Sequence, residues 1–225
     1  MAGVVAVDLQ PEPPEELRRS QEEFGSKVVF TQGDVRLEKT AEEFTRTAID
    51  KFGRIDVLIS NAGTSVVRAI HEHTPEEWDA VMDTNVKATY WAARHVVPIM
   101  IKQHGGLILM TGSISGQAGI PAQGAYGPSK GALHQMTRQM AIDYAKYNIR
   151  VNAIGCGTVD TPMVHKAAKA SGDEEGFWEM LRSNHPIGRI ATPDEVAAFF
   201  AYLASDYATF FTGAILMLDG GYTAH

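Results

Sequence analysis

The chain has 225 residues, 44% hydrophobic and 21% charged, which is too apolar for a disordered chain and long enough to bury a core. Its 27 acidic and 20 basic residues give a net charge of −7, and the absence of a lysine- and arginine-rich run disfavours a nucleic-acid partner. A single cysteine, Cys156, excludes an intramolecular disulfide and a zinc site built from several cysteines.

Six short apolar runs have the composition of β-strands. They are nearly continuous rather than alternating, which is typical of strands buried on both faces of a parallel sheet. In chain order they are residues 4–7, 27–30, 55–60, 107–111, 150–154 and 214–218.

Amphipathic stretches separate these runs, and two of them begin with a threonine cap, a proline and two acidic residues. We expect helices over residues 38–52, from 75 to about 102 with a bend near Pro98, over 125–147, and from 193 onward. Alternating strands and helices predict a doubly wound, three-layer αβα fold of the Rossmann-like type, in one domain over residues 1–225.

Small and polar residues follow four of the predicted strands. Because open α/β sheets bind ligands beyond the carboxyl ends of their strands, these residues outline a candidate site. Each turn taken singly is equally typical of an ordinary loop. The segments are Asp8, Asn61-Ala62-Gly63, Gly112-Ser113 and Gly155–Thr158.

Asp8 ends the first predicted strand. A carboxylate at that place in a dinucleotide-binding fold accepts hydrogen bonds from the adenosine ribose and repels a 2′-phosphate. The next basic residue downstream is Arg18, so no local cation is expected to neutralise such a phosphate. This favours NAD over NADP, although a solvated loop aspartate explains the residue as well.

Tyr126 and Lys130 are four residues apart, which places them on one face of a helix. A free phenol has a pKa near 10, and a neighbouring ammonium group favours its ionised form. A shift of about two to three units would require roughly 3–4 kcal/mol, which a partly desolvated cleft can supply. The same spacing also occurs on solvated helices.

Two further polar residues lie close to predicted apolar elements. Ser113 follows a buried strand and could hold a carbonyl oxygen, but it has no partner histidine, so a hydrolase triad is not indicated. Asn85 lies on a helix face and could equally be a structural core residue. His71 and His73 lack an accompanying cluster of acids or cysteines, so we expect no metal site.

Together, these residues resemble the motifs of the short-chain dehydrogenase/reductase family, in order and over essentially the whole chain. Residues 52–63 (FGRIDVLISNAG) resemble the family's Asn-Ala-Gly segment, and Tyr126 and Lys130 match its Tyr-x-x-x-Lys motif. Asn85 and Ser113 match its helical asparagine and catalytic serine. The remaining matches are Asp34-Val35 as an adenine-contacting pair, Thr158–Pro162 as a nicotinamide-side segment and Asp219–Gly221 as a C-terminal signature.

The resemblance implies an NAD-dependent oxidoreductase that transfers hydride between nicotinamide and a secondary alcohol or ketone. Tyr126 would be the general acid or base, Ser113 would hold the substrate oxygen, and Lys130 would lower the tyrosine pKa and contact the nicotinamide ribose. Asn85 would support a water-linked proton relay. The implied cofactor contacts are Asp8, Asp34, Val35, Asn61, Ala62, Gly63, Tyr126, Lys130, Val159 and Thr161, and the implied substrate contacts are Ser113, Ser115, Gln123 and Tyr126.

Residues 163–190 fit the family's variable substrate lid, and the family's usual state implies a homo-oligomer, either a tetramer or a dimer. The chain departs from the family at two places. Family members begin with a strand, a glycine-rich loop and a helix, and no such loop precedes Asp8, so we expect the N-terminal βα unit to be missing. Cys156 stands where the family usually has proline, which frees a backbone N–H.

Three functions remain open at this stage. The leading one is the oxidoreductase; the second is a non-catalytic interaction subunit, or inactive short form, that has lost cofactor binding; the third is an isomerase or dehydratase with bound NAD. The longest apolar run, Val196 to Ala204, is half a membrane span, and no secretory signal is recognisable. We therefore expect a cytoplasmic protein without a membrane partner.

Overall fold

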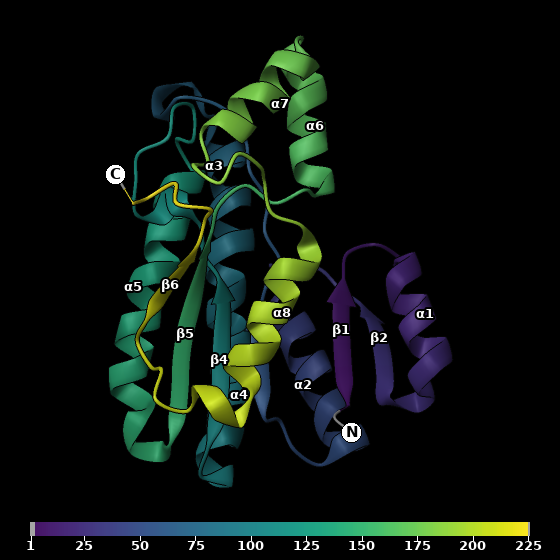
Figure 1. Cartoon of the computed structure of the whole chain (residues 1–225). Helices are drawn as coiled ribbons and strands as arrows, with labels where there is room; N and C mark the ends of the chain where they lie inside the picture. The colour runs from purple at the N-terminus through teal and green to yellow at the C-terminus, as the bar shows by residue number, and fades with distance from the viewer. Residues whose placement is uncertain (1–2, 225) are drawn as a thin grey trace.

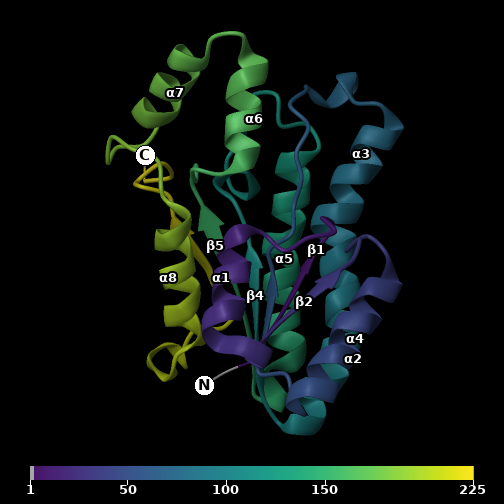
Figure 2. The same cartoon turned by 90° about the vertical axis from the view of Figure 1, so that its right-hand side faces the viewer.

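Parallel strands lie between two layers of helices in the computed structural model, which describes residues 3–224 (Figures 1 and 2). The strands are β1 (Val4–Asp8), β2 (Val28–Gln32), β3 (Val57–Ser60), β4 (Gly106–Thr111), β5 (Ile149–Cys156) and β6 (Ile215–Leu218). The helices are α1 (Glu15–Phe24), α2 (Glu38–Phe52), α3 (Pro75–Met82), α4 (Ala88–Gln103), α5 (Tyr126–Tyr144), α6 (Pro162–Ser171), α7 (Glu174–Ser183) and α8 (Pro193–Ala204). The expected αβα architecture is confirmed.

The strands form two sheets rather than one. β1 pairs only with β2, while the second sheet has the order β3-β4-β5-β6, and every pair is parallel. Within residues 3–224, no backbone hydrogen bond joins β1 to β3.

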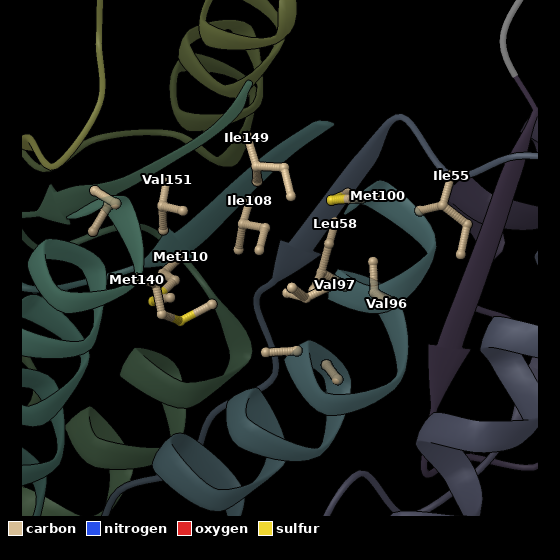
Figure 3. Packing of buried hydrophobic residues seen from close by; sticks show 14 of the residues in the cluster. Ile55, Leu58, Val96, Val97, Met100, Ile108, Met110, Met140, Ile149 and Val151 are labelled. Carbon is tan, nitrogen blue, oxygen red and sulfur yellow. The ribbon is translucent and has the colours of Figure 1, made fainter. Parts of the chain in front are cut away.

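The main hydrophobic core lies between the larger sheet and the helices α4 and α5. Figure 3 shows Met110 of β4 beside Met140 of α5, and both are buried. A second cluster joins the opposite face of β4 and β5 to Phe200 and Leu203 of α8. Figure 2 shows α1 and α8 on one side of the strands and α2, α4 and α5 on the other. Among residues 3–224, no helix is long and apolar enough to cross a bilayer.

The helix expected from residue 75 to about 102 is confirmed as one continuous helical run from Pro75 to Gln103, but it contains a π-helical turn that the sequence did not indicate. α3 ends at Met82, a π-helical turn covers Asp83–Lys87, and α4 continues from Ala88 with Pro98 inside it. The wider turn holds Asn85 with its side chain inside the protein, where it bonds to a distant loop. π-turns of this kind are often found at functional sites. The helix over residues 38–52 has the predicted bounds.

Removing side-chain volume from the core should destabilise the fold. Ile108 of β4 is fully buried, so Ile108→Ala is expected to lower the free energy of unfolding by about 3 kcal/mol through lost burial and the cavity left behind. The matched variant Ile142→Ala, at a residue 80% exposed, should change it by less than about 0.5 kcal/mol. Urea denaturation followed by circular dichroism measures both, and equal losses would contradict this description of the core.

Candidate active site

The predicted site residues lie at the carboxyl ends of the strands, at the end of the molecule where α6 and α7 are placed (Figure 1). Strands β3, β4 and β5 each lead directly into one segment of the site. The first residues of α5 bring in the Tyr126–Lys130 pair from the helical layer. A parallel sheet therefore assembles at one edge residues that are far apart in sequence.

Lys130 is almost fully buried, with 3% of its surface exposed. Its Nζ donates a hydrogen bond to the carbonyl oxygen of Thr111, the last residue of β4, at 2.7 Å. The same nitrogen lies 5.5 Å from the centroid of the Tyr126 ring. Burial disfavours the charged ammonium group and lowers the pKa of Lys130 from 10.5 to about 8. The pKa of Lys130 therefore lies much closer to neutral pH than that of an exposed lysine.

Tyr126 opens α5 and is partly buried. Burial raises the pKa of its phenol, a hydrogen bond with the Ser113 side chain lowers it, and the nearby Cys156 raises it. The net shift of the Tyr126 pKa is upward, with burial as its largest cause. The Lys130 ammonium group lies over the Tyr126 ring and is bonded to the Thr111 carbonyl, while burial opposes ionisation of the phenol.

Ser113 is placed by the turn that follows β4 and is buried. Its Oγ accepts a hydrogen bond from the backbone N–H of Ser115 and also contacts the Ser115 hydroxyl, both at 3.2 Å. These bonds fix the Ser113 side chain within reach of Tyr126. The structure therefore brings together the two hydroxyl groups that the sequence analysis assigned to the substrate oxygen.

Asn85 connects the π-turn to the rest of the site, with 1% of its surface exposed. Its Nδ2 donates to the carbonyl of Thr64 at 3.0 Å and to Oγ of Ser129 at 2.9 Å, and its Oδ1 accepts from the Thr64 N–H at 2.8 Å. Ser129 lies immediately before Lys130 on α5. Asn85 therefore fastens the loop after β3 to the helix that carries the tyrosine and lysine.

The Asn61-Ala62-Gly63 segment passes closely over this cluster. Asn61 Oδ1 accepts a hydrogen bond of 2.8 Å from the Thr111 hydroxyl. A Cβ atom added at Gly63 would lie 3.4 Å from Asn85 Oδ1 and 3.8 Å from Lys130 Nζ. The small residue lets the backbone approach the buried polar groups. One connected set of contacts thus links the ends of β3 and β4 to α5.

The other predicted cofactor contacts lie across the break in the sheet. Asp8, at the end of β1, is exposed and accepts a hydrogen bond of 2.9 Å from the N–H of Gln10. Asp34, next to Val35 in the loop after β2, forms an ion pair of 2.6 Å with Arg36, which lowers the pKa of Asp34. Asp8 makes no salt bridge within residues 3–224, so its carboxylate can accept hydrogen bonds from hydroxyl groups.

The segments beyond β5 complete the rim of the site. Val159 forms an isolated parallel bridge with Ala191, and Thr161 precedes the first turn of α6. Cys156, the last residue of β5, is buried, and burial raises the pKa of its thiol to about 11. The thiol is therefore protonated and a poor nucleophile at neutral pH. The Oε1 atom of Gln123 is buried and has no hydrogen-bond partner within the described residues.

Sequence analysis missed four residues that organise the site. Thr64, Thr111 and Ser129 act through the bonds described above, partly through backbone carbonyls that have no sequence signature. His185 is buried, accepts a bond of 3.1 Å from the Thr158 N–H, and lies 2.7 Å from the carbonyl of Leu181. His185 thus ties the loop after β5 to the end of α7. Its position just before Pro186 gave no signal by itself.

Comparisons with known proteins identify the family. The model of a family described as "Enoyl-(Acyl carrier protein) reductase" matches residues 2–223. A 2-(R)-hydroxypropyl-CoM dehydrogenase from Xanthobacter autotrophicus is 34% identical, over 98% of this chain and 88% of its own length. The chain belongs to the short-chain dehydrogenase/reductase family of oxidoreductases.

Solved structures agree with this assignment. L-sorbose reductase from Gluconobacter frateurii, complexed with NADPH and L-sorbose, superposes with a TM-score of 0.92 at 32% identity, covering 100% of this chain and 88% of that one. A 3-ketoacyl-(acyl-carrier-protein) reductase from Brucella melitensis, complexed with NADH, gives a TM-score of 0.87 at 27% identity, covering 99% and 88%. Both nicotinamide cofactors thus occur among similar proteins.

The residues present fit the reactive half of a nicotinamide cofactor. Hydroxyl and ammonium groups gather around Tyr126 and Lys130, and the backbone at Gly63 leaves room for close approach. On the other side, Asp8 offers a carboxylate suited to ribose hydroxyl groups. Between Asp8 and Asn61 the sheet is broken, so within residues 3–224 no turn from an intervening strand reaches this part of the edge.

Burial of the Lys130 ammonium group should lower the free energy of unfolding of the protein at neutral pH. Because its pKa falls from 10.5 to about 8 on folding, the unfolded chain binds more protons between these values, and wild-type stability should rise with pH there. The penalty at pH 7 is about 3 kcal/mol from the shift, and losing the bond to Thr111 offsets about 1 kcal/mol of it. We expect Lys130→Met to be about 2 kcal/mol more stable than wild type at pH 7.

Urea denaturation of both proteins at pH 7 and pH 10 checks this expectation. The advantage of Lys130→Met should shrink as the pH rises, because the wild-type lysine then loses its charge. The control Lys102→Met, at an exposed residue, should show no such pH dependence. A Lys130→Met protein that is less stable than wild type at pH 7 would contradict the assignment.

Proposed function

We propose that the chain is an NAD-dependent oxidoreductase that interconverts a secondary alcohol and a ketone. The observation that carries the proposal is the polar set at the carboxyl edge of the sheet, in which the partly buried Tyr126 lies with the buried side chains of Asn85, Ser113 and Lys130. A bound nicotinamide would accept or supply the hydride. The chain itself would position the substrate and move a proton.

Tyr126 is the proposed proton donor and acceptor at the substrate oxygen. Ser113 would donate a hydrogen bond to the same oxygen and hold it beside the phenol, since the two side chains already interact. Lys130, with a pKa of about 8, can change its protonation state near neutral pH without large cost. Its bond to Thr111 keeps the ammonium group facing the tyrosine ring. Asn85 would position the loop and any relay water.

The proposed preference for NAD rests on Asp8. A carboxylate there would accept bonds from the 2′- and 3′-hydroxyl groups of a ribose and would repel a 2′-phosphate. The nearby Arg18 is bonded to the carbonyl of Pro13 and to Glu12, so its charge is already paired. The NADPH bound to the sorbose reductase keeps NADP as the competing possibility, which a titration decides.

The same assignment leads to proposals for the substrate cover, the oligomeric state and the compartment. We propose that α6 and α7, within residues 163–190, cover the substrate, and that Ser115 and Gln123 contact it. We further propose a homo-oligomer, dimer or tetramer, as the family resemblance implies. The cytoplasm is the proposed compartment, since the free thiol of Cys156 fits a reducing environment.

A second candidate is a non-catalytic interaction subunit, which the broken sheet favours. Within residues 3–224, no strand lies between β1 and β3, at the edge where cofactor phosphates would lie. This candidate predicts a folded protein that does not bind NADH. An isomerase or dehydratase with tightly bound NAD is a third candidate, and it predicts turnover without net NADH formation.

Removing the phenol should abolish proton transfer. In an assay that follows NADH absorbance over a panel of secondary alcohols and ketones, Tyr126→Phe is expected to lower kcat by about 10² to 10⁴ while NADH affinity changes little. The control Tyr207→Phe, at an exposed residue, should leave kcat unchanged. Equal activity of wild type and Tyr126→Phe would overturn the role given to this residue.

The cofactor preference is tested by fluorescence titration with NADH and, separately, NADPH. Wild type should bind NADH more tightly, and Asp8→Asn should reduce the ratio of the two affinities about tenfold, or about 1.4 kcal/mol, by removing the repulsive charge. Asp206→Asn, at an exposed position, serves as the control. Tighter binding of NADPH by wild type would exclude the NAD preference, and a folded chain that binds neither would favour the interaction subunit.

A further inference from the structure

The loop that leads into Tyr126 is held by a segment far away in the sequence. The backbone N–H of Arg68 donates to the carbonyl of Ala122 at 2.8 Å, and the N–H of Gly124 donates to the carbonyl of Arg68 at 2.9 Å. A Cβ atom at Gly124 would lie 2.6 Å from the backbone nitrogen of Ile70, so this close approach requires glycine. The loop before α5 is therefore fastened to the segment that begins at Arg68.

Ala125, immediately before Tyr126, depends on a side chain from outside α5 for its hydrogen bond. Ala125 is fully buried and stands at the N-cap position of α5, where its methyl group cannot cap the helix. Its N–H donates to Nε2 of His73 at 3.2 Å. Because buried backbone donors are almost always paired, His73 supplies a bond that the start of this helix needs.

The His73 ring is buried in the orientation that this bond requires, with 2% of its side chain exposed. An N–H can donate only to the imidazole nitrogen that carries no proton, so the ring proton of neutral His73 is on Nδ1. Nδ1 makes no hydrogen bond within residues 3–224 and lies 3.9 Å from Oε2 of Glu77. The negative charge of this carboxylate favours a proton on Nδ1 and leaves Nε2 free to accept.

Glu77 is itself held in place by two partners. Its Oε2 accepts a bond of 3.2 Å from the N–H of Thr74, as part of the capping box that begins α3, and its Oε1 pairs with Nε of Arg68 at 3.3 Å. The backbone of the same Arg68 holds Ala122 and Gly124. The carboxylate, the imidazole ring and the loop before α5 thus form one connected unit.

We propose that His73 is a positioning residue for Tyr126. The bond from Ala125 fixes the first turn of α5, and with it the direction in which the phenol leaves the helix. The consequence for turnover rests on the proposed function: Tyr126 must lie beside Ser113 to share the substrate oxygen, and a displacement of about 1 Å can lower a rate about 10²-fold. His73 touches neither substrate nor cofactor in this scheme and acts only through the tyrosine.

The first test follows the Tyr126 ring directly and needs neither cofactor nor substrate. All seven tyrosines are replaced by 3-fluorotyrosine, and the fluorine NMR signal missing from Tyr126→Phe identifies Tyr126. His73→Leu should shift or broaden this signal, because the Ala125 N–H then loses its acceptor. The signal of Tyr144, at the other end of α5, is identified in the same way and should not change.

Two further variants separate the hydrogen bond from general packing. His73→Gln carries an amide oxygen that can accept at about the place of Nε2, and it should keep the Tyr126 signal near its wild-type position. His71→Leu removes an exposed histidine two residues away and should leave the signal unchanged.

The second test measures turnover of secondary alcohols and ketones. His73→Leu should lower kcat about 10- to 100-fold with less than about twofold change in KM and in NADH affinity, whereas His73→Gln should stay within about threefold of wild type. In a Tyr126→Phe background, His73→Leu should cause no further loss, because the group that it positions is absent. An equal fold loss in both backgrounds would contradict a role through Tyr126.

Nitrogen-15 NMR of histidine-labelled wild type tests the bond without any change in packing. The His73 signals, identified by their absence from His73→Gln, should show a protonated Nδ1 and an unprotonated Nε2. A proton on Nε2 would overturn the proposal even where His73→Leu does not fold, and so would a Tyr126 signal that is unchanged in a folded His73→Leu or shifted equally by the Leu and Gln variants. An inactive wild type whose Tyr126 signal responds to His73→Leu would reject the proposed function and retain the positioning role.

Discussion

The bond from the buried Lys130 ammonium group to the Thr111 carbonyl is the constraint on which the site depends. It joins α5 to the end of β4 and determines where Tyr126 lies relative to the sheet. Burial makes a charged group in such a place costly, and the same burial lowers the pKa of Lys130 to about 8. Hydrogen bonds at Thr111 offset part of this cost: its carbonyl accepts from Lys130, and its hydroxyl donates to Asn61. Local instability is thus concentrated where chemistry is proposed.

The structure divides into parts that are packed to different degrees. β4 and β5, with α4, α5 and α8, contain nearly all of the large buried side chains, and the Asn85–Ser129 bond lies within this well-packed part. The unit from β1 to β2 lies on the other side of the break and relies on α2 for its position. The reactive half of the site is therefore stabilised independently of the half that carries Asp8.

Much of the fold could be predicted from sequence because its signals are local. The helix over residues 38–52 and the continuous apolar strands depend on patterns within single segments. α1 was not predicted, because none of its residues is buried and its sequence therefore needs no clear apolar stripe. The π-turn could not be predicted, since it depends on contacts between Asn85 and the distant backbone of Thr64.

The same distinction holds for the site. Tyr126, Lys130, Ser113 and Asn85 were identified by the family resemblance, and the structure places them together. The upward shift of the Tyr126 pKa has burial as its largest cause, and the spacing of two residues on a helix does not show how deeply a phenol is buried. Lys130 donates its hydrogen bond to a backbone carbonyl.

The π-turn at Asp83–Lys87 determines how the side chains of α3 are rotated about the helix axis relative to those of α4. Each residue of an α-helix turns the next side chain by about 100°, so a single extra residue rotates everything before it relative to everything after it. α3 and α4 are therefore two rotational settings of one helix, joined at Asn85. Deleting one residue here would leave the composition almost unchanged and would turn α3 away from its present contacts. In this region the number of residues, and not only their identity, determines which side chains of α3 and α4 face the site.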